Sequence, residues 1–429
     1  MRHLAGTVLA AGLVVLLNLA SASAAENADA NFVPPKPAFP EQTKAPAVRK
    51  PSAVKVETIA SGLTRPWALA FLPDGKFLVT ERNGFMRTIT RDGVISAPIE
   101  GVPGVKAVAA EGLHDLALDP DFVHNRLLYF TYFAPPPGEA PAIWPNHFFY
   151  DDVFSKSVAE RRTMKVGMER VARARLSEDE KRLEDVTTLV DGPDRRIAFA
   201  PDGTLFITGP DRPRFYDSDL DGTDHPPADP DIRRNFAGRV SRINPDGTIP
   251  KDNPFLDRPN VAPDVYSFGH RDPEGAAINP ATGELWAIEH GPRGGDEVNI
   301  IRKGRDYGWP VITYGRQYSG DPVNGGLTAK EGMEQPVYFW VPSIAPCGMT
   351  FYTGDLFPDW KGNLFIGALA GKHLVRLVLD GNEVVAEESL LTDLDQRIRD
   401  VRQGPDGALY VVTDAGSILK LTPGDERTR

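Results

Sequence analysis

The stretch Leu72-Pro-Asp-Gly-Lys-Phe-Leu-Val-Thr80 contains a tight turn followed by a run of apolar and β-branched residues. The same pattern returns almost unchanged at Ala200-Pro-Asp-Gly-Thr-Leu-Phe-Ile-Thr208. Pro and Asp favour the first positions of a turn, Gly supplies backbone freedom, and the residues that follow favour a β-strand. Each stretch therefore predicts a turn that leads into a strand.

Four further stretches repeat this pattern, one of them weakly. They are Asn279-Pro-Ala-Thr-Gly-Glu-Leu-Trp-Ala287, Asp359-Trp-Lys-Gly-Asn-Leu-Phe-Ile366, Gly404-Pro-Asp-Gly-Ala-Leu-Tyr-Val-Val412 and the weaker Leu118-Asp-Pro-Asp-Phe-Val-His-Asn-Arg-Leu-Leu-Tyr129. Five intervals of about 66 residues separate Gly75 from Gly407. A recurring hairpin at this period is typical of a propeller, whose blades are small antiparallel sheets packed on one another. The sequence predicts an all-β fold, a six-bladed β-propeller over residues 54–425; a β-sandwich or two stacked domains are the alternatives.

Residues 1–24 have the features of an export signal. Arg2 and His3 form a short basic start, an apolar run follows from Leu4 to Ala20, and small residues up to Ala24 offer cleavage sites. An uncleaved anchor is the alternative, because the apolar run is close to the length of a short spanning helix. We expect cleavage, no stable membrane span afterwards, and a periplasmic or secreted protein.

Two segments do not follow the repeat. Residues 25–53 have prolines at positions 34, 35, 37, 40, 46 and 51 and little apolar periodicity. This composition predicts an extended linker outside the fold. The polar residues of 136–166 predict an insertion between blades, either a plain surface loop or a lid over a substrate.

The composition excludes one class of partner. The formal net charge is -11, whereas a nucleic-acid surface needs clustered Lys and Arg. We therefore expect no nucleic acid. The chain has a single cysteine, Cys347, so it cannot form an internal disulfide.

The densest group of polar residues runs from Tyr266 to Tyr318. It contains Gly269-His-Arg-Asp-Pro-Glu-Gly275 and Glu289-His-Gly-Pro-Arg-Gly-Gly-Asp-Glu297. Gly291 and Pro292 allow backbone carbonyls to approach a ligand, and carbonyls with a carboxylate are the hard ligands that calcium prefers. A structural network of Arg and Asp side chains between blades is an equally good explanation.

Several long motifs resemble one known family. Arg65-Pro-Trp-Ala-Leu-Ala-Phe-Leu-Pro-Asp-Gly75 resembles the opening of the soluble PQQ-dependent aldose sugar (glucose/sorbosone) dehydrogenases, where PQQ is pyrroloquinoline quinone. Gly238-Arg-Val-Ser-Arg-Ile-Asn-Pro-Asp-Gly247, Pro342-Ser-Ile-Ala-Pro346 and the stretch from Gln396 to Gly407 are similar to that family as well. The resemblance covers nearly all of residues 55–422 and also implies a six-bladed propeller.

The resemblance implies PQQ as the cofactor, and its three carboxylates require cationic partners. The positions that match the family's cofactor pocket are Arg271, Asp272, Tyr318, Tyr338, Ser343, Lys372, Arg397 and Arg399. Lys372 lies two residues after the family's lysine, whose aligned residue is Ala370. The i, i+2 spacing of Arg397 and Arg399 places both on one face of a strand.

The resemblance also implies Ca²⁺. It places the cofactor calcium at the backbone carbonyls of Gly291 and Pro292, where the ion acts as a Lewis acid on the quinone. Glu297 and Tyr307 match a second, structural calcium position.

The chain departs from the family at the active face. Gly192 stands where the family has its general base, a histidine. Ala110 and Glu274 replace glutamines, and Asp272 replaces an asparagine. His114 and Asp191 are candidate replacements for the missing base, with Glu111 as a further acceptor; an ordinary structural role is the alternative for His114.

The resemblance therefore implies PQQ- and calcium-dependent oxidation of an aldose sugar to a lactone. The partners are a small-molecule sugar and an electron acceptor that the sequence does not identify. Because the base position is Gly192, the alternative is a non-catalytic propeller that binds a sugar or a protein. A calcium-dependent hydrolase is a third hypothesis, but only one blade supplies the acidic residues it needs, Asp272 and Glu274.

Overall fold

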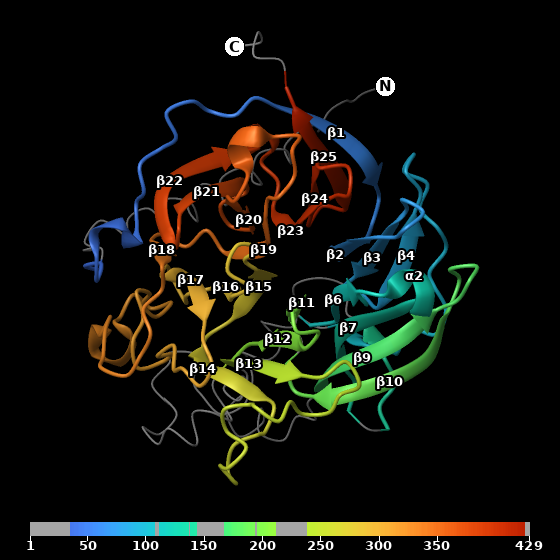
Figure 1. Cartoon of the computed structure of the whole chain (residues 1–429), viewed down its shortest axis with the longest axis horizontal. Helices are drawn as coiled ribbons and strands as arrows, with labels where there is room; N and C mark the ends of the chain where they lie inside the picture. Colours follow the sequence, from blue (N-terminus) through green and yellow to red (C-terminus); the bar gives the residue numbers. More distant parts are fainter. Residues whose placement is uncertain are drawn as a thin grey trace, which may run out of the picture. The chain divides into compact units, whose positions relative to one another are not determined.

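The computed structural model describes residues 35–107, 111–136, 138–143, 167–193, 195–211 and 238–424. These residues form six antiparallel blades around a central axis, and Figure 1 looks along that axis. Five blades have four strands and one has three. The predicted all-β, six-bladed propeller is confirmed.

The strands of each blade follow one another from the axis outward. Blade 1 consists of β2 (Pro66–Phe71), β3 (Phe77–Glu81) and β4 (Phe85–Ile89). Blade 2 consists of β6 (Leu113–Leu118), β7 (Leu127–Ala134), β9 (Met168–Leu176) and β10 (Leu183–Asp191). Blade 3 consists of β11 (Ile197–Phe199), β12 (Leu205–Gly209), β13 (Gly238–Ile243) and β14 (Val265–His270). Blade 4 consists of β15 (Pro273–Ile278), β16 (Leu285–Glu289), β17 (Asp296–Ile301) and β18 (Tyr338–Trp340). Blade 5 consists of β19 (Pro346–Phe351), β20 (Leu364–Ala368), β21 (Leu374–Asp380) and β22 (Glu383–Leu390). Blade 6 consists of β23 (Ile398–Gln403), β24 (Leu409–Thr413), β25 (Ser417–Pro423) and β1 (Val54–Ser61).

The remaining elements are short. They are the parallel pair β5 (Lys106–Ala107) and β8 (Ala142–Ile143), the helix α2 (Phe122–Asn125) and the 3₁₀ turns η1 (Pro40–Gln42), η2 (Val323–Gly326), η3 (Pro358–Trp360) and η4 (Thr392–Leu394). No helix in the described part of the chain is long and apolar enough to cross a membrane. The predicted signal, residues 1–24, and most of the predicted insertion lie outside the described residues.

The repeated turns join the innermost strand of a blade to the second strand. In three of them the glycine N–H donates to the carbonyl three residues earlier: Gly75 to Leu72 at 2.8 Å, Gly203 to Ala200 at 2.9 Å and Gly407 to Gly404 at 3.0 Å. These glycines have φ angles of +87°, +85° and +78°, a conformation that other residues adopt only with strain. The glycine of the repeat is therefore a backbone requirement in these three blades.

The first strand of the propeller completes the last blade. β1 pairs antiparallel with β25 from Val54 opposite Pro423 to Ser61 opposite Ser417. The first and last strands of the propeller thus meet in one sheet, as Figure 1 shows where β1 lies beside β25. This pairing closes the ring of blades.

Residues 37–53 pack on the propeller, so the expectation that the whole segment 25–53 lies outside the fold is wrong for this part. Gln42 is fully buried and donates to the carbonyl of Pro336 at 2.9 Å. Ala47 forms a parallel bridge with Glu387 on β22. Composition did not reveal these contacts because a proline-rich segment can dock through a few polar groups. We call residues 37–53 the N-terminal strap.

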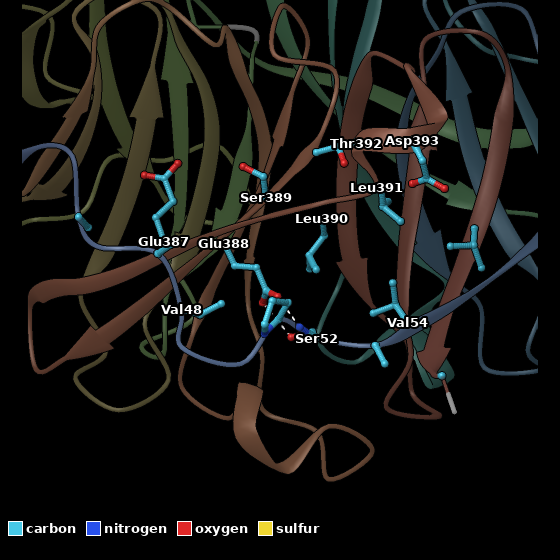
Figure 2. A pocket seen from close by; sticks show the side chains of 16 residues that line it. Val48, Ser52, Val54, Glu387, Glu388, Ser389, Leu390, Leu391, Thr392 and Asp393 are labelled. Atoms are coloured by element: carbon cyan, nitrogen blue, oxygen red, sulfur yellow. Dashed lines mark hydrogen bonds between the residues drawn. The ribbon is translucent and has the colours of Figure 1, made fainter. Parts of the chain in front are cut away.

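A pocket of about 800 Å³ lies between the strap and β22. Figure 2 shows its walls, which include Val48 and Ser52 of the strap and the stretch from Glu387 to Asp393. The carboxylate of Glu388 is already bonded to Ser52 Oγ (2.8 Å) and Arg376 Nη1 (3.0 Å). The pocket contains none of the site residues that the sequence predicts.

Apolar side chains fill the space between neighbouring blades. Between blades 4 and 5, Trp286 and Val298 pack with Met349 and Leu364. The ring of Trp286 meets the ring of Phe351 edge-on at 5.5 Å. Because each strand turns its apolar face toward the next blade, the core is divided among the interfaces between blades.

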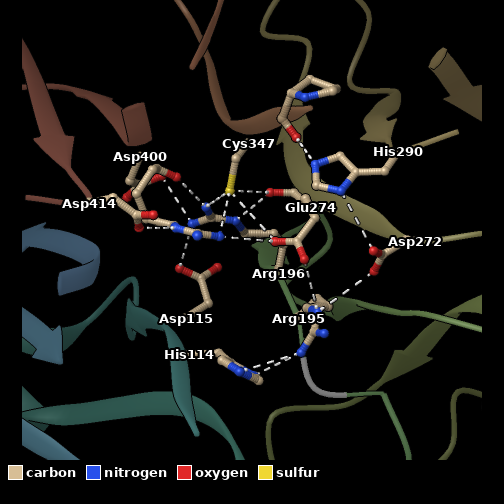
Figure 3. Close-up of polar contacts among 12 residues, drawn as sticks. His114, Asp115, Arg195, Arg196, Asp272, Glu274, His290, Cys347, Asp400 and Asp414 are labelled. Atoms are coloured by element: carbon tan, nitrogen blue, oxygen red, sulfur yellow. Dashed lines mark hydrogen bonds and ion pairs between the residues drawn. The ribbon is translucent and has the colours of Figure 1, made fainter. Parts of the chain in front are cut away.

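The axis itself is occupied by charged groups rather than apolar ones. Arg196, just before β11, is buried and its guanidinium contacts the innermost strand of each of the other blades. The contacts are Asp400 Oδ1 (3.0 Å), Asp115 Oδ1 (3.5 Å), the carbonyls of Glu274 (2.8 Å) and Arg399 (2.9 Å), Cys347 Sγ (3.5 Å) and the ring of Trp67 (3.9 Å). Figure 3 shows most of this group. Arg402 also bonds both Asp115 and Asp400, at 2.8 Å each.

Replacing Arg196 by Met should destabilise the propeller strongly. The change leaves Asp115 and Asp400 buried with Arg402 as their remaining cation, and breaking a buried pair costs about 3 kcal/mol or more. The free energy of urea unfolding measures this loss. Lys361→Met, which removes an exposed pair with Asp355, should leave the unfolding midpoint unchanged. Equal stability of Arg196→Met and the native chain would contradict the assigned role.

Candidate functional site

The six innermost strands all begin at one end of the propeller, which we call the top face. Just above Arg196 lies Arg195, whose side chain is 4% exposed. It contacts three carboxylates, Glu274 at 3.2 Å, Glu111 at 3.5 Å and Asp272 at 3.9 Å. Its Nη1 also donates to the ring of His114 at 3.3 Å. We call Arg195 and these four partners the Arg195 cluster, and Figure 3 shows Arg195 with His114, Asp272 and Glu274 next to the axial group.

Arg195 was not predicted as a site residue. Glu274 and Asp272 were predicted only as departures from a family pattern, and His114 as a candidate base. The available signal was the pair Arg195-Arg196 directly before the innermost strand of the third repeat. A buried arginine requires carboxylate partners, and these come from blades 2 and 4.

Asp272 and His290 form an ion pair on the same face, with His290 Nδ1 3.6 Å from Asp272 Oδ2. The other ring nitrogen, Nε2, bonds the carbonyl of Pro346 at 3.0 Å. Burial by itself raises the pKa of Asp272, but His290, Arg195 and Arg271 outweigh it and hold that pKa well below its usual range. Burial lowers the pKa of His290, and the bond to Asp272 more than reverses this. The negative charge of Asp272 is thus compensated by His290, Arg195 and Arg271.

Arg271 lies beside this pair with its guanidinium partly exposed. Its Nη1 donates to the carbonyl of His290 at 3.0 Å, and its Nη2 lies 3.5 Å from the hydroxyl of Tyr318, which is 66% exposed. The guanidinium also lies over the ring of Trp309 at 5.6 Å. The structure therefore brings together Arg271, Asp272 and Tyr318 of the predicted set.

Arg397 and Arg399 share one acidic partner, as expected for side chains on one face of a strand. Each Nε donates to Asp414 at 3.0 Å. Burial raises the pKa of Asp414, but the charge of Arg399 and the hydrogen bonds from both arginines dominate and lower it to about 2. The two arginines thus share Asp414, and Arg399 also lies 3.9 Å from the carboxylate of Glu274.

A third arginine adds to this positive charge. Burial first, and then the charges of Arg399 and Arg65, lower the pKa of Arg82 to about 10. No side chain of the described residues hydrogen-bonds the Arg82 guanidinium. Arg82 thus adds a cation without a hydrogen-bonded carboxylate near Arg399, and such a group of arginines fits a ligand that carries several carboxylates.

The loop from His290 to Gly295 presents unused carbonyls. The Gly291 N–H donates to Asp296 at 2.9 Å, and a Cβ at Gly291 would overlap the carbonyl of Gly294. Within the described ranges, nothing donates a hydrogen bond to the carbonyl oxygens of Gly291 or Pro292. Two free carbonyl oxygens in a rigid loop fit a hard cation such as calcium.

Glu297 and Tyr307 lie deeper in blade 4. Asn299 Nδ2 bridges Glu289 (2.9 Å) and Glu297 (3.1 Å), while its own Oδ1 is buried without a hydrogen bond. Burial and the charge of Glu289 raise the pKa of Glu297 well above its usual range. The Tyr307 hydroxyl is engaged by the Arg302 N–H at 2.8 Å. Two carboxylates and an unused amide oxygen fit a second cation.

Other predicted residues have different surroundings. Tyr338 lies on β18, the outermost strand of its blade, fully buried, and donates to Glu387 at 2.6 Å. Lys372 pairs with Asp395 at 2.8 Å, and Ser343 donates to Asp296 at 2.8 Å. Among the described residues, neither Tyr338 nor Lys372 contacts Arg271.

The two candidate bases have different positions. His114 is the second residue of β6 and is fully buried between Arg195 and the ring of Trp67, whose centroid is 5.1 Å away. Asp191 ends β10, the outermost strand of blade 2, and accepts a 2.9 Å bond from Arg170. At Gly192, a Cβ would lie 2.6 Å from Arg239 Nη2. Only His114 contacts the Arg195 cluster.

Comparisons with known proteins agree with this geometry. A family model described as Glucose / Sorbosone dehydrogenase matches residues 63–420. Aldose sugar dehydrogenase YliI of Escherichia coli is 38% identical over an alignment of 389 residues, which covers 87% of this chain and 94% of that protein. Quinoprotein glucose dehydrogenase B of Acinetobacter calcoaceticus is 26% identical over 85% of this chain and 86% of its own.

The solved structures include a similar protein with its cofactor. The PQQ-bound form of the aldose sugar dehydrogenase from Streptomyces coelicolor has a TM-score of 0.63 and 26% identity. The match covers 88% of this chain and 99% of that structure. The fold, the family model and these relatives agree, and the chain therefore belongs to the glucose/sorbosone dehydrogenase family.

Proposed function

We propose that this chain oxidises an aldose sugar at C1 to a lactone, using PQQ and calcium. The observation that carries the proposal is the group of like charges at Arg82, Arg397 and Arg399, whose guanidinium groups suit an anion with several carboxylates. The free carbonyls of Gly291 and Pro292 supply the cation position on the same face. The relatives whose names include "quinoprotein" and "PQQ-bound" support the same cofactor.

Bound PQQ would supply an acceptor for the hydride from the sugar C1, and bound calcium would supply a Lewis acid beside it. The chain's own residues hold these groups. Arg271, Arg397 and Arg399 neutralise the carboxylates, with Tyr318 at the rim. Gly291 and Pro292 hold the calcium, and Glu297 with Tyr307 holds a second, structural ion. Ser343 and Lys372 stay predicted members of the pocket, whereas Tyr338 is fully buried on the outermost strand of blade 4 and bonds Glu387 instead.

The proton of the sugar hydroxyl needs an acceptor other than residue 192. Of the two candidates, His114 is the one in contact with the Arg195 cluster, so we assign it this role. His114 is fully buried, with the guanidinium of Arg195 against its ring. Asp191, held by Arg170, becomes the acceptor if His114 proves dispensable.

A second function is favoured by one observation, the absence of any side chain at Gly192. A propeller that keeps its cationic face but lacks a base can bind a sugar or a protein without turnover. In either case we propose a periplasmic or secreted protein, and for the enzyme an electron acceptor of a class still to be identified.

Titration of the metal-free protein with PQQ and calcium chloride separates these functions. We expect PQQ absorbance to shift only when calcium is present, and a panel of aldoses to reduce a dye with the loaded protein. EDTA should abolish both signals. Binding without turnover would favour the non-catalytic alternative, and no binding would overturn the dehydrogenase proposal.

Arg397→Gln should weaken PQQ binding about tenfold, because a hydrogen bond between charged groups contributes about 1.5 kcal/mol. The dissociation constant is measured by the same absorbance titration. Lys361→Gln removes a cation far from the top face and is the control, with native affinity expected. Unchanged affinity of Arg397→Gln would remove this arginine from the cofactor site.

His114→Ala should lower kcat by about 10²-fold or more, the usual contribution of a general base. The PQQ dissociation constant should not change, because His114 contacts Arg195 rather than the cofactor arginines. Steady-state kinetics and the absorbance titration measure the two quantities. A native kcat in this variant would transfer the assignment to Asp191, and Asp191→Asn is then the matching variant.

A further inference from the structure

One buried carboxylate, Asp296, holds two loops of the top face together. Its side chain is fully buried at the start of β17. Oδ1 accepts hydrogen bonds from the Gly291 N–H and from Ser343 Oγ, at 2.9 Å each. Oδ2 accepts from Ser343 Oγ at 2.8 Å and from the N–H groups of Ile344 at 2.7 Å and Ala345 at 2.9 Å.

The two loops have different origins. The first, residues 290–295, joins β16 to β17 within blade 4. The second, residues 341–345, leads from β18 of blade 4 to β19 of blade 5. The Gly295 N–H also bonds the carbonyl of Trp340 at 2.8 Å, so the loops are attached at both ends of the first. A shift of either loop therefore requires breaking the bonds to Asp296.

The bond to Gly291 has a specific geometric effect. The ring of Pro292 fixes its own φ angle and restricts the residue before it. The bond to Asp296 fixes the peptide plane between His290 and Gly291, and so the direction in which the chain enters Pro292. Together these constraints limit the arrangements open to the carbonyls of Gly291 and Pro292. The carboxylate also places negative charge behind them, which favours a cation in front.

We infer that Asp296 is a positioning residue that presents the Gly291 and Pro292 carbonyls to calcium. The inference rests on the proposed function, because it assigns the ion to these carbonyls. Asp296 does not touch the ion; it acts through the N–H of Gly291. Residues that orient the ligands of a metal typically change its affinity about 10- to 100-fold when they are replaced.

The test measures how much calcium is needed for PQQ uptake. Metal-free protein receives a fixed amount of PQQ and increasing calcium chloride, and absorbance reports the bound cofactor. Asp296→Asn keeps the shape but places an amide NH₂ group against backbone N–H groups. We expect its half-saturating calcium concentration to rise about 10- to 100-fold. Should this variant not fold, Asp296→Ser is measured in the same way.

Glu388→Gln is the matched control. Glu388 is likewise a buried carboxylate with several donors, Ser52 and Arg376, but it lies on the outer strand of blade 5. We expect it to lower the unfolding temperature and to leave the calcium requirement unchanged. A merely structural role for Asp296 predicts that both variants lose stability and that neither changes the calcium requirement.

The outcomes separate the inference from the function on which it rests. A folded Asp296 variant with the native calcium requirement overturns the inference and leaves the proposed function intact. Native protein that takes up no PQQ at any calcium concentration overturns the proposed function itself. A raised requirement in the Asp296 variant alone supports both.

Discussion

A single guanidinium at the axis constrains the whole propeller. Arg196 contacts a side chain or carbonyl from the innermost strand of every other blade. A buried charge is tolerated only when its partners are in place, so the six strands have one common arrangement around the guanidinium. Apolar contacts between blades are less directional. They hold neighbouring blades together, while Arg196 sets all six blades relative to one another.

The candidate site inherits its geometry from this axial group. Arg195 directly precedes Arg196 in the chain, and Arg399 contributes its carbonyl to Arg196. Glu274 contributes its carbonyl to Arg196 and its carboxylate to Arg195. The sheets therefore position these side chains with little help from surface loops. The cation position differs, because its carbonyls belong to a loop and depend on Asp296 for their orientation. The top face thus combines groups fixed by strands with groups fixed by one carboxylate.

The sequence predicted those parts of the fold that depend on local chemistry. A turn of Pro, Asp and Gly acts within four residues, so Gly75, Gly203 and Gly407 could be assigned from their neighbours alone. The spacing of Arg397 and Arg399 likewise predicted a shared face, and both bond Asp414. The Arg195 cluster was missed because its partners, Glu111 and Glu274, lie in other blades. The docking of Gln42 was missed for the same reason, since Pro336 is far away in sequence.

The closure of the ring also orders events in time. Val54 on β1 pairs with Pro423 on β25. β1 is therefore the first strand to be synthesised, but it can pair only after β25, the last strand, has been synthesised. Contacts between such distant residues form slowly, because the intervening chain must first be brought together. Until the two strands pair, β1 and the outer edge of β25 each present unpaired backbone groups to other strands. The N-terminal strap precedes β1 directly, and its docking on blades 4 and 5 keeps that waiting strand beside its place.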